Sequence, residues 1–419
     1  MSTRWGALIA SSALVLCNLT GLASGVSQTP SPSEKRESLP RVFLLDSAEL
    51  ASIRMEDPKN PRRIEIVNAA VAEADRAMKE GPFSVMDKSV TPPSGDKHDY
   101  MSQAPYFWPD PTKPDGLPYI RRDGEHNPEI RKITDHDEWG RMSADARALA
   151  LAYYFTGKPE YAERASLLLR TWFLNPATKM NPNLEFGQGI PGINTGRGIG
   201  IIESRFLVDD TDAVGLLAGS KAWTTADSDG MADWMKKYLT WMRTSDKGKA
   251  EAAAKNNHGT WYDLQVTDFA LFLGDAQLAK ETLEGVKTRR IAVQIEPDGR
   301  QPLELARTNA WGYSNGNLDG LCKLATLGVE AGVDLWHFRT ADGRSIQAAI
   351  DFLAPYAAGE KKWDYQQIGG FHADAMAASL WRAAEAYHDP KYSALAEKLD
   401  GHENVELLLL KAKAPGTAR

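Results

Sequence analysis

The sequence contains little cysteine. Its two cysteines are Cys17 and Cys322, and Cys17 lies in an N-terminal segment that we expect to be removed. A single remaining cysteine cannot form an internal disulfide, so a disulfide framework is excluded. Because Cys322 falls within the helical apolar pattern "NLDGLCKLATLGV", we predict that it is a small buried side chain and not a nucleophile.

Positive charge is not in excess. The chain has 49 Lys and Arg against 56 Asp and Glu, which gives a formal net charge of −7. Nucleic-acid-binding proteins typically carry a basic face or stripe, so no nucleic-acid partner is expected. An anionic ligand would need a local cationic site, because the field of the whole chain does not attract it. The oligomeric state is left open.

Long hydrophobic runs are missing after the N-terminus. The run "GALIASSALVLC" follows Arg4, is shorter than the roughly 20 apolar residues that span a bilayer, and precedes the small residues of "GLASG". These features predict a signal peptide over residues 1–25. We expect a flexible Ser/Pro-rich leader over residues 26–40 and a single domain over residues 41–412, without a membrane span. The protein is therefore expected in the periplasm or outside the cell.

Alternating patterns typical of strands are scarce, and the best short candidate is "RRIAVQIEPDG" at residues 289–299. Helical patterns dominate instead, with apolar residues at three-to-four spacing. Three segments share one plan, in which a helix meets a tight turn and a second helix starts at once: "LAYYFTGKPEYAERASLLL", "FALFLGDAQLAKETLEGV" and "AAEAYHDPKYSALAEKL". Such recurring antiparallel hairpins predict an all-α fold, an α/α toroid.

Two segments interrupt the helical pattern, residues 96–129 and residues 181–205. The first is rich in Pro, Gly and aromatics and is a candidate lid over a substrate. The second contains "GRGIG", which lacks the spacing and the βαβ context of a phosphate-binding loop. Aromatic and cationic side chains of these segments are candidates for binding a sugar polymer or its carboxylates, and core packing or salt bridges are the alternative. These candidates are Tyr100, Tyr106, Trp108, Arg121, Arg122 and Arg197.

Two further strings carry polar residues suited to catalysis. "AAAKNNHGTWYDLQV" places Asn256, Asn257 and His258 together, where a turn or helix cap is the simpler explanation. "QPLELARTNAWGYS" contains Arg307, Trp311 and Tyr313, and we count Asn256 and Trp311 among the substrate-binding candidates. The set has no nucleophile with a visible base and no metal-ligand spacing, so neither a metal nor a cofactor is expected.

An amide, an imidazole, a guanidinium and a phenol suit β-elimination from a uronic acid polymer. Asn257 and Arg307 would neutralise the substrate carboxylate and stabilise the charge that develops at C5. His258 would assist or act as the base, and Tyr313 would act as the acid and could also serve as the base. We expect the cationic Arg307 to lower the pKa of Tyr313.

These strings resemble motifs of the bacterial alginate lyase superfamily, which are helical-toroid polysaccharide lyases. "NNHGTWYD" is similar to its Asn-Asn-His motif, and "QPLELARTNAWGYS" is similar to its Leu-Glu-x-x-Arg segment followed by the catalytic tyrosine. The resemblance covers about residues 60–390. It implies active-site roles for Asn257, His258, Arg307 and Tyr313 and an anionic polysaccharide substrate. The interval of six between Arg307 and Tyr313 is one residue shorter than in the best-known alginate lyases, which indicates a side branch acting on alginate, glucuronan or another polyuronate.

Two alternatives remain open from the sequence. An inverting glycoside hydrolase on the same toroid would use two carboxylates, with Asp99 and Glu203 as the candidates. A non-catalytic glycan-binding protein of helical-hairpin repeats would need none of the proposed proton carriers. A lyase alone leaves an unsaturated uronate that absorbs in the ultraviolet.

Overall fold

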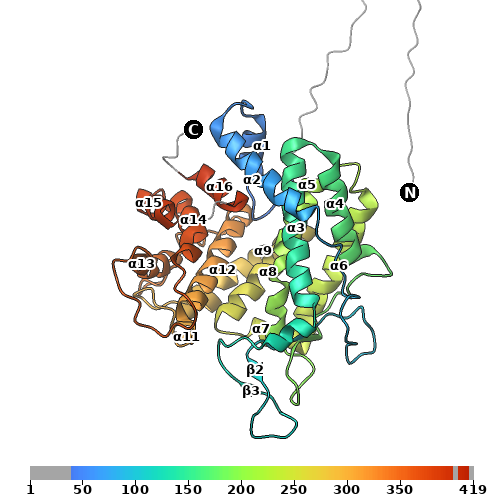
Figure 1. The fold of residues 1–419 in the computed structure, drawn as a ribbon. Coiled ribbons are helices and arrows are strands. Elements are labelled where there is room, and N and C mark those ends of the chain that lie inside the picture. The colour runs from blue at the N-terminus through green and yellow to red at the C-terminus, as the bar shows by residue number, and fades with distance from the viewer. Residues whose placement is uncertain (1–38, 400–403, 415–419) are drawn as a thin grey trace, which may run out of the picture. The chain divides into compact units, whose positions relative to one another are not determined.

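Helices form nearly all the regular structure in residues 39–399 and 404–414, the part of the chain that the computed structural model describes (Figure 1). The longer helices are α1 (Ser47–Met55), α2 (Pro61–Ala77), α3 (Asp135–Thr156), α4 (Pro159–Leu169), α5 (Leu207–Leu217), α6 (Thr225–Thr244), α7 (Asp246–Ala252), α8 (Asn257–Leu273), α9 (Ala276–Val286), α12 (Ala310–Ala331), α13 (Ile346–Ala357), α14 (Ala377–Tyr387), α15 (Pro390–Leu399) and α16 (Val405–Lys413). Shorter helical turns are η1 (Pro128–Lys132), η2 (Arg170–Leu174), η3 (Gly198–Phe206), η4 (Lys287–Ile291), α10 (Ala292–Gln294), α11 (Pro302–Leu305) and η5 (Ala373–Met376).

The three predicted helical hairpins are confirmed as the pairs α3–α4, α8–α9 and α14–α15. Each first helix ends at a residue with positive φ: Gly157 at 70°, Gly274 at 78° and His388 at 52°. A left-handed residue ends a helix and turns the chain sharply, and glycine adopts this conformation at little cost. The left-handed residues Gly157, Gly274 and His388 therefore set the hairpin geometry.

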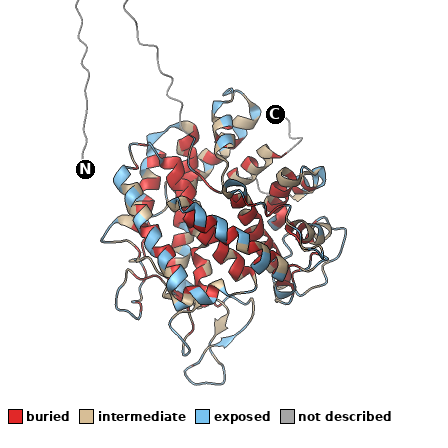
Figure 2. Ribbon diagram, turned by 180° about the vertical axis from the view of Figure 1, so that it is seen from behind, coloured by how far each residue is buried: buried red, intermediate tan, exposed pale blue. Residues whose placement is uncertain are grey.

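The hairpins are arranged in a ring. α3 packs against α5, α5 against α8, α8 against α12, and α12 against α14. The C-terminal α16 contacts both α14 and α2, and α2 packs on α3, so α16 closes the ring. Buried residues run through the middle of the helical layers (Figure 2), and Trp139, Trp172 and Trp381 are among the largest of them. The predicted all-α toroid is confirmed.

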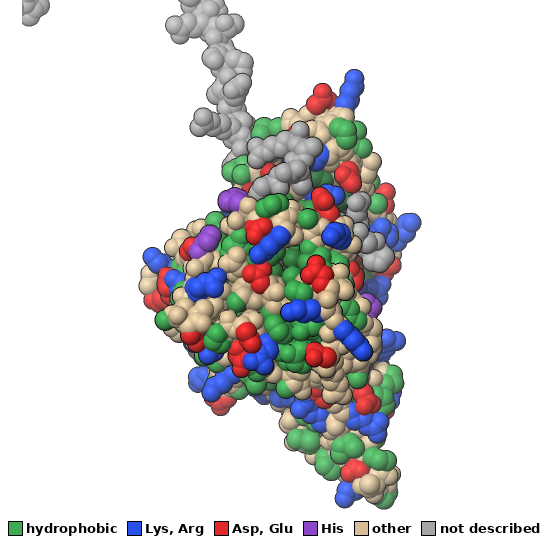
Figure 3. Space-filling view, turned by 90° about the vertical axis from the view of Figure 1, so that its left-hand side faces the viewer, with side chains coloured by type: hydrophobic (Ala, Val, Ile, Leu, Met, Phe, Trp, Pro, Cys, Tyr) green, Lys and Arg blue, Asp and Glu red, His purple; other side chains and the backbone are tan. Residues whose placement is uncertain are grey.

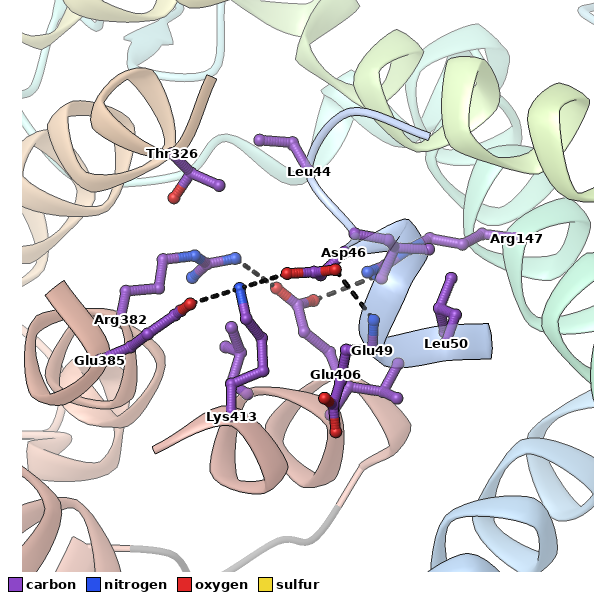
Figure 4. Close-up of a pocket in the computed structure, with 13 residues that line it drawn as sticks. Leu44, Asp46, Glu49, Leu50, Arg147, Thr326, Arg382, Glu385, Glu406 and Lys413 are labelled. Carbon is purple, nitrogen blue, oxygen red and sulfur yellow. Dashed lines mark hydrogen bonds and ion pairs between the residues drawn. The ribbon is translucent and has the colours of Figure 1, made fainter. Parts of the chain in front are cut away.

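Glu406 fixes the ring-closing helix α16 in place (Figure 4). Its carboxylate accepts hydrogen bonds from Arg147 of α3 at 3.1 Å and Arg382 of α14 at 2.9 Å. Burial opposes ionisation of Glu406, but Arg147, Arg382 and Lys323 outweigh it and hold the pKa of this carboxyl well below its usual range. Lys413, at the other end of α16, pairs with Glu385 at 2.7 Å. One charged group thus joins three helices that are far apart in the sequence.

The predicted strand at residues 289–299 is wrong. The segment continues α9 as η4 and α10. Ile291 and Ile295 are fully buried, whereas Val293 between them is 49% exposed. In a strand all three side chains would lie on one face, so the exposure of Val293 excludes a strand, whereas residues four apart share a face of a helix. The prediction for Cys322 is confirmed, because this residue is buried in α12 and burial raises the pKa of its thiol to about 12.

The two irregular segments contain all four short strands of the described residues. β1 (Met101–Gln103) pairs in parallel with β4 (Phe186–Gly189), and β2 (Phe107–Trp108) pairs with β3 (Ile120–Arg121) as an antiparallel hairpin. In Figure 1 this hairpin and α7 lie at the end opposite α1 and α16. The two irregular segments therefore lie together at one end of the toroid.

Two predictions concern membranes and charge. The predicted signal peptide and nearly all of the leader lie outside the described residues, and no described helix has the length and apolarity to cross a bilayer. On the face shown in Figure 3, basic and acidic side chains of the described residues are intermixed, without a large area of one sign. This face therefore offers no large positive area to an anion.

Candidate active site

A cavity of about 630 Å³ lies at the end of the toroid that carries the β2–β3 hairpin. Its wall combines the first irregular segment, the second irregular segment, the start of α8 and the start of α12. The structure brings eight of the predicted site residues to this wall: Tyr106, Arg121, Arg197, Asn256, Asn257, His258, Arg307 and Tyr313. Segments separated by about two hundred residues therefore share one site.

Two predicted substrate-binding aromatics belong to the core instead. Tyr100 is 0% exposed, and its hydroxyl donates to Glu203 at 2.7 Å. Trp311 is 1% exposed, and its indole Nε1 donates to the carbonyl of His372 at 2.7 Å. Neither side chain can reach a ligand in the cavity, so the prediction that they bind substrate is wrong.

Other candidates lie outside the cavity wall as well. Trp108 on β2 donates from Nε1 to the carbonyl of Glu125 at 3.0 Å, and the guanidinium of Arg122 lies over its ring. Asp99 is buried and accepts a hydrogen bond from Asn181 at 2.9 Å. Of the two carboxylates that a hydrolase would use, only Glu203 lines the cavity.

The Asn-Asn-His string is both a helix start and part of the site. Asn256 is the N-cap of α8, but its side chain makes no capping hydrogen bond, and Asn257 is the first residue of the helix. The backbone N–H and the side-chain Nδ2 of Asn257 both donate to Glu304, each at 2.7 Å. Burial raises the pKa of Glu304, and the two Asn257 hydrogen bonds oppose this rise. Glu304 was not predicted as a site residue, although it is the Glu of the Leu-Glu-x-x-Arg segment.

His258 has a buried carboxylate behind it. Its Nδ1 lies 2.7 Å from Oε1 of Glu251 in α7, and Glu251 is 0% exposed. When Nδ1–H donates to the carboxylate, Nε2 keeps a free lone pair, because the two ring nitrogens of a neutral imidazole have opposite roles. Glu251 was missed by the sequence analysis, since a break between two helices separates it from His258 and leaves no periodic signal.

The Tyr313 hydroxyl takes part in two hydrogen bonds. Arg307 Nη2 donates to the Tyr313 hydroxyl at 2.7 Å, and this hydroxyl donates to that of Tyr106 at 2.7 Å. Burial and the neighbouring Tyr106 raise the pKa of Tyr313 well above its usual value. Arg307 opposes this rise but does not reverse it, so the expectation of a lowered phenol pKa is wrong. Arg307 acts weakly because its charge is balanced by Asp123, which it contacts at 2.8 Å.

Two further guanidiniums line the cavity without a carboxylate partner. Arg197 donates to Gln188 at 2.8 Å and Arg205 to the carbonyl of Ile202 at 3.2 Å, and neither forms an ion pair within the described part of the chain. Burial lowers the pKa of Arg197 to about 10 and also lowers that of Arg205. Both groups bring positive charge to the cavity wall, which also holds the carboxylates of Glu203 and Asp137. Arg205 was not predicted, although it is the last residue of the second irregular segment.

The described residues contain no group of three or more His, Cys, Asp or Glu side chains placed to hold a metal ion.

The chain is similar to known alginate lyases. A family model described as Alginate lyase matches residues 84–363. The crystal structure of an alginate lyase from Bacteroides ovatus is 41% identical, with a TM-score of 0.85 over 89% of this chain and 99% of that chain. Alginate lyase A1-III from Sphingomonas species A1 is 16% identical, with a TM-score of 0.56 over 90% of this chain and 98% of that chain. The likeness to A1-III concerns the fold alone. No curated protein matches the chain.

Proposed function

Because the chain belongs to the alginate lyase family and is therefore a polysaccharide lyase, we propose that its cavity binds and cleaves alginate or a closely related polymer of 1,4-linked uronic acids. One observation carries this proposal. Asn257, His258 and Tyr313 meet in a single cavity that also holds the guanidiniums of Arg197 and Arg205. An amide, a base, an acid and cations are the groups that β-elimination from a polyuronate requires.

The reaction breaks two bonds of the polymer. A base removes the proton at C5, next to the carboxylate, and the electron pair forms a C4–C5 double bond. The C4–O bond then breaks, and an acid protonates the departing glycosidic oxygen. The product carries a conjugated double bond at its new non-reducing end.

We assign the base to His258 in the proposed mechanism. A carboxylate that accepts from Nδ1–H orients the imidazole and stabilises the imidazolium that forms when Nε2 takes a proton. Glu251 is buried and lies 2.7 Å from Nδ1, which suits this task. His258 lines the cavity, so its remaining ring nitrogen is available to a bound sugar.

We assign the acid to Tyr313. Because its pKa is raised by burial and by Tyr106, the phenol is protonated at neutral pH. A protonated phenol can give its proton to the leaving oxygen but cannot remove one from C5. The two transfers therefore belong to different residues in this proposal.

We assign neutralisation of the substrate carboxylates to Asn257, Arg197 and Arg205. Glu304 holds the Asn257 amide in place, and the two guanidiniums have no carboxylate partner among the described residues. Arg307 was predicted to share this task, but it is already paired with Asp123. Polar groups placed in advance around the developing charge lower the barrier without reorganisation.

The remaining sequence predictions are part of the same proposal. Residues 1–25 would direct export and be removed, residues 26–40 would form a leader, and residues 41–412 would form the catalytic domain. Export would place the enzyme in the periplasm or outside the cell, where polymers too large to enter the cell are degraded.

The proposal is tested by the ultraviolet absorbance of the products. Purified protein is incubated with alginate, poly-mannuronate, poly-guluronate and glucuronan, and at least one of these should give a rising absorbance. Tyr313→Phe keeps the ring but removes the hydroxyl that carries the acidic proton, and it should lower kcat about 100-fold or more, because general acid catalysis contributes at least that much. Tyr153→Phe, a partly buried tyrosine of α3 outside the cavity wall, is the matched control and should retain full activity. New reducing ends without absorbance would show a hydrolase, and binding without cleavage would show a glycan-binding protein.

A further inference from the structure

Two residues beside the β2–β3 hairpin contact Tyr313, the proposed acid, or its neighbour Arg307. Tyr106 precedes β2 and Asp123 follows β3, and the backbone N–H of Arg122 donates to the carbonyl of Tyr106 at 2.7 Å. The two residues thus lie side by side at the base of the hairpin. Tyr106 accepts the hydrogen bond from Tyr313, and Asp123 binds Arg307. The same carboxylate also accepts a hydrogen bond from Arg121 of β3 at 2.5 Å.

Asp123 holds Arg307 through a fork of hydrogen bonds. Arg307 Nε donates to both carboxylate oxygens at 3.1 Å, and Nη2 donates to Oδ1 at 2.8 Å. The adjacent Thr308 donates its backbone N–H to the same carboxylate at 3.2 Å and its hydroxyl to the Asp123 carbonyl at 2.7 Å. A bidentate contact of this kind fixes the orientation of a guanidinium as well as its charge. The side chain of Arg307 therefore has one preferred position.

The backbone approaches closely at this junction. Gly124 has a φ of 76°, and a Cβ added there would lie 2.5 Å from the Thr308 hydroxyl and 2.5 Å from Ile368 Cδ1. Glycine permits both the left-handed backbone and the close approach. The hairpin is thus built to dock against the segment that precedes α12.

Arg307 in turn fixes the position of the Tyr313 side chain. Its guanidinium carbon lies 3.7 Å from the centre of the Tyr313 ring, and its Nη2 donates to the hydroxyl at 2.7 Å. Because Tyr313 donates in turn to Tyr106, the contacts form a closed circuit from Asp123 through Arg307 and Tyr313 back to the hairpin. Each group in the circuit is held from two directions.

We propose that Asp123 is a positioning residue, which holds Arg307 over Tyr313 and so makes docking of the hairpin a condition for placing the acid. This inference rests on the proposed role of Tyr313. It assigns Arg307 to the phenol and not to the substrate carboxylate. The β2–β3 hairpin is then part of the catalytic apparatus and not only a cover over the substrate.

A competing assignment makes the opposite prediction. If Asp123 occupied a site on Arg307 that belongs to the substrate carboxylate, the substrate would have to displace it. Removing the Asp123 charge would then tighten substrate binding and lower KM. If Asp123 positions the acid, its removal should lower kcat and leave KM nearly unchanged.

The test is Asp123→Asn, with Asp115→Asn as the matched control. Asp115 is an exposed carboxylate of the same hairpin and bonds only the backbone N–H of Leu117 among the described residues. On the polyuronate that the wild type cleaves fastest, kcat of Asp123→Asn should fall about 10- to 100-fold, as for other residues that orient an active group. KM should stay within about twofold, and Asp115→Asn should match the wild type.

The pH profile gives a second readout. The charged and titratable groups that face the Tyr313 hydroxyl are Arg307, Tyr106 and Asp123, and of these only Arg307 lowers the pKa of Tyr313. Without the Asp123 charge, Arg307 keeps only the more distant Glu304 as a counter-charge and Arg121 loses its carboxylate partner, so the positive charge near Tyr313 increases and the alkaline limb of kcat should move to lower pH. A change that merely loosened the hairpin would lower activity without this displacement.

Arg307→Lys keeps the charge but cannot bond Asp123 and Tyr313 in one plane. It should reproduce the kcat loss of Asp123→Asn, and it gives the answer if that variant fails to fold. An unchanged kcat in both variants, or a lower KM in Asp123→Asn, would overturn the inference. If the wild type itself forms no unsaturated product, the proposed function fails instead, so the two failures can be told apart.

Discussion

Replacing Glu251 by Gln tests whether His258 is the base. Glu251 lies on α7, is 0% exposed, and accepts the Nδ1–H of His258 at 2.7 Å. Its second oxygen, Oε2, is buried with no hydrogen-bond partner in the described chain, so the carboxylate serves His258 almost alone. Gln keeps the size of the side chain but removes its charge.

The expected loss follows from the kind of hydrogen bond that changes. A hydrogen bond to a charged group contributes about 1.5–3 kcal/mol and a neutral one about 0.5–1.5 kcal/mol. The difference is about 1–2 kcal/mol, which corresponds to a decrease of about 5- to 30-fold in kcat when it is lost in the transition state. The loss would be greater if the Gln amide donated to Nδ1, because the proton of the neutral imidazole would then sit on Nε2, which could no longer act as a base.

The assay is the initial rate of ultraviolet absorbance on the preferred polyuronate, with kcat and KM determined separately. KM should change little, because Glu251 does not line the cavity. Glu360→Gln, the same replacement at an exposed position of the loop after α13, is the control for the chemistry of the substitution. Circular dichroism and the melting temperature would show whether the buried replacement alters folding.

A kcat within twofold of the wild type would refute the reasoning. The imidazole would then need no carboxylate, and His258 could not be the base in the form proposed. The proton at C5 would have to be taken by Tyr313, whose raised pKa would then have to be overcome by the bound substrate.

Two further predictions concern stability. Glu406→Gln should lower the free energy of unfolding by about 2 kcal/mol, because Arg147 and Arg382 would lose their nearest carboxylate and keep only Asp209 and Asp319, each at 3.6 Å. Chemical denaturation measures this loss, and exposed Glu397→Gln on α15 should show none. Burial raises the pKa of Asp212 to about 7, from about 3.9 in an unfolded chain. The native state therefore binds the extra proton, and the contribution of Asp212 to stability falls as pH rises from about 4 to about 7. The melting temperature of Asp212→Asn should thus depend less on pH between 5 and 8 than that of the wild type, and parallel curves would contradict the prediction.

The helices could be predicted because their signals are local. Apolar residues at three-to-four spacing and a turn residue after each first helix, such as Gly157 or Gly274, are present in the sequence itself. The false strand at residues 289–299 shows the limit of this approach. Alternating apolar residues fit a strand, and only burial shows that Ile291 and Ile295 face the core while Val293 does not.

The site was predictable in its principal groups but not in their partners. Tyr100 and Tyr106 lie six residues apart in one aromatic segment, yet one is buried against Glu203 and the other lines the cavity. Asp123 meets Arg307 across 184 positions of the sequence. Such a pairing depends on how the segments meet in the folded chain, and a single sequence carries no local pattern for it.

The two strings that suggested catalysis are linked by the segment from Glu304 to Tyr313. Glu304 holds Asn257 at the start of α8, the helix that carries the proposed base. Arg307 precedes Asn309, the N-cap of α12, and Tyr313 is the fourth residue of that helix, so the guanidinium folds back over the phenol ring. An interval of six residues suits this stacked arrangement. The segment is hydrogen-bonded to α8 at one end, through Glu304 and Asn257, and to α12 at the other, through Arg307 and Tyr313. It therefore fixes α8, which carries the proposed base, relative to α12, which carries the proposed acid.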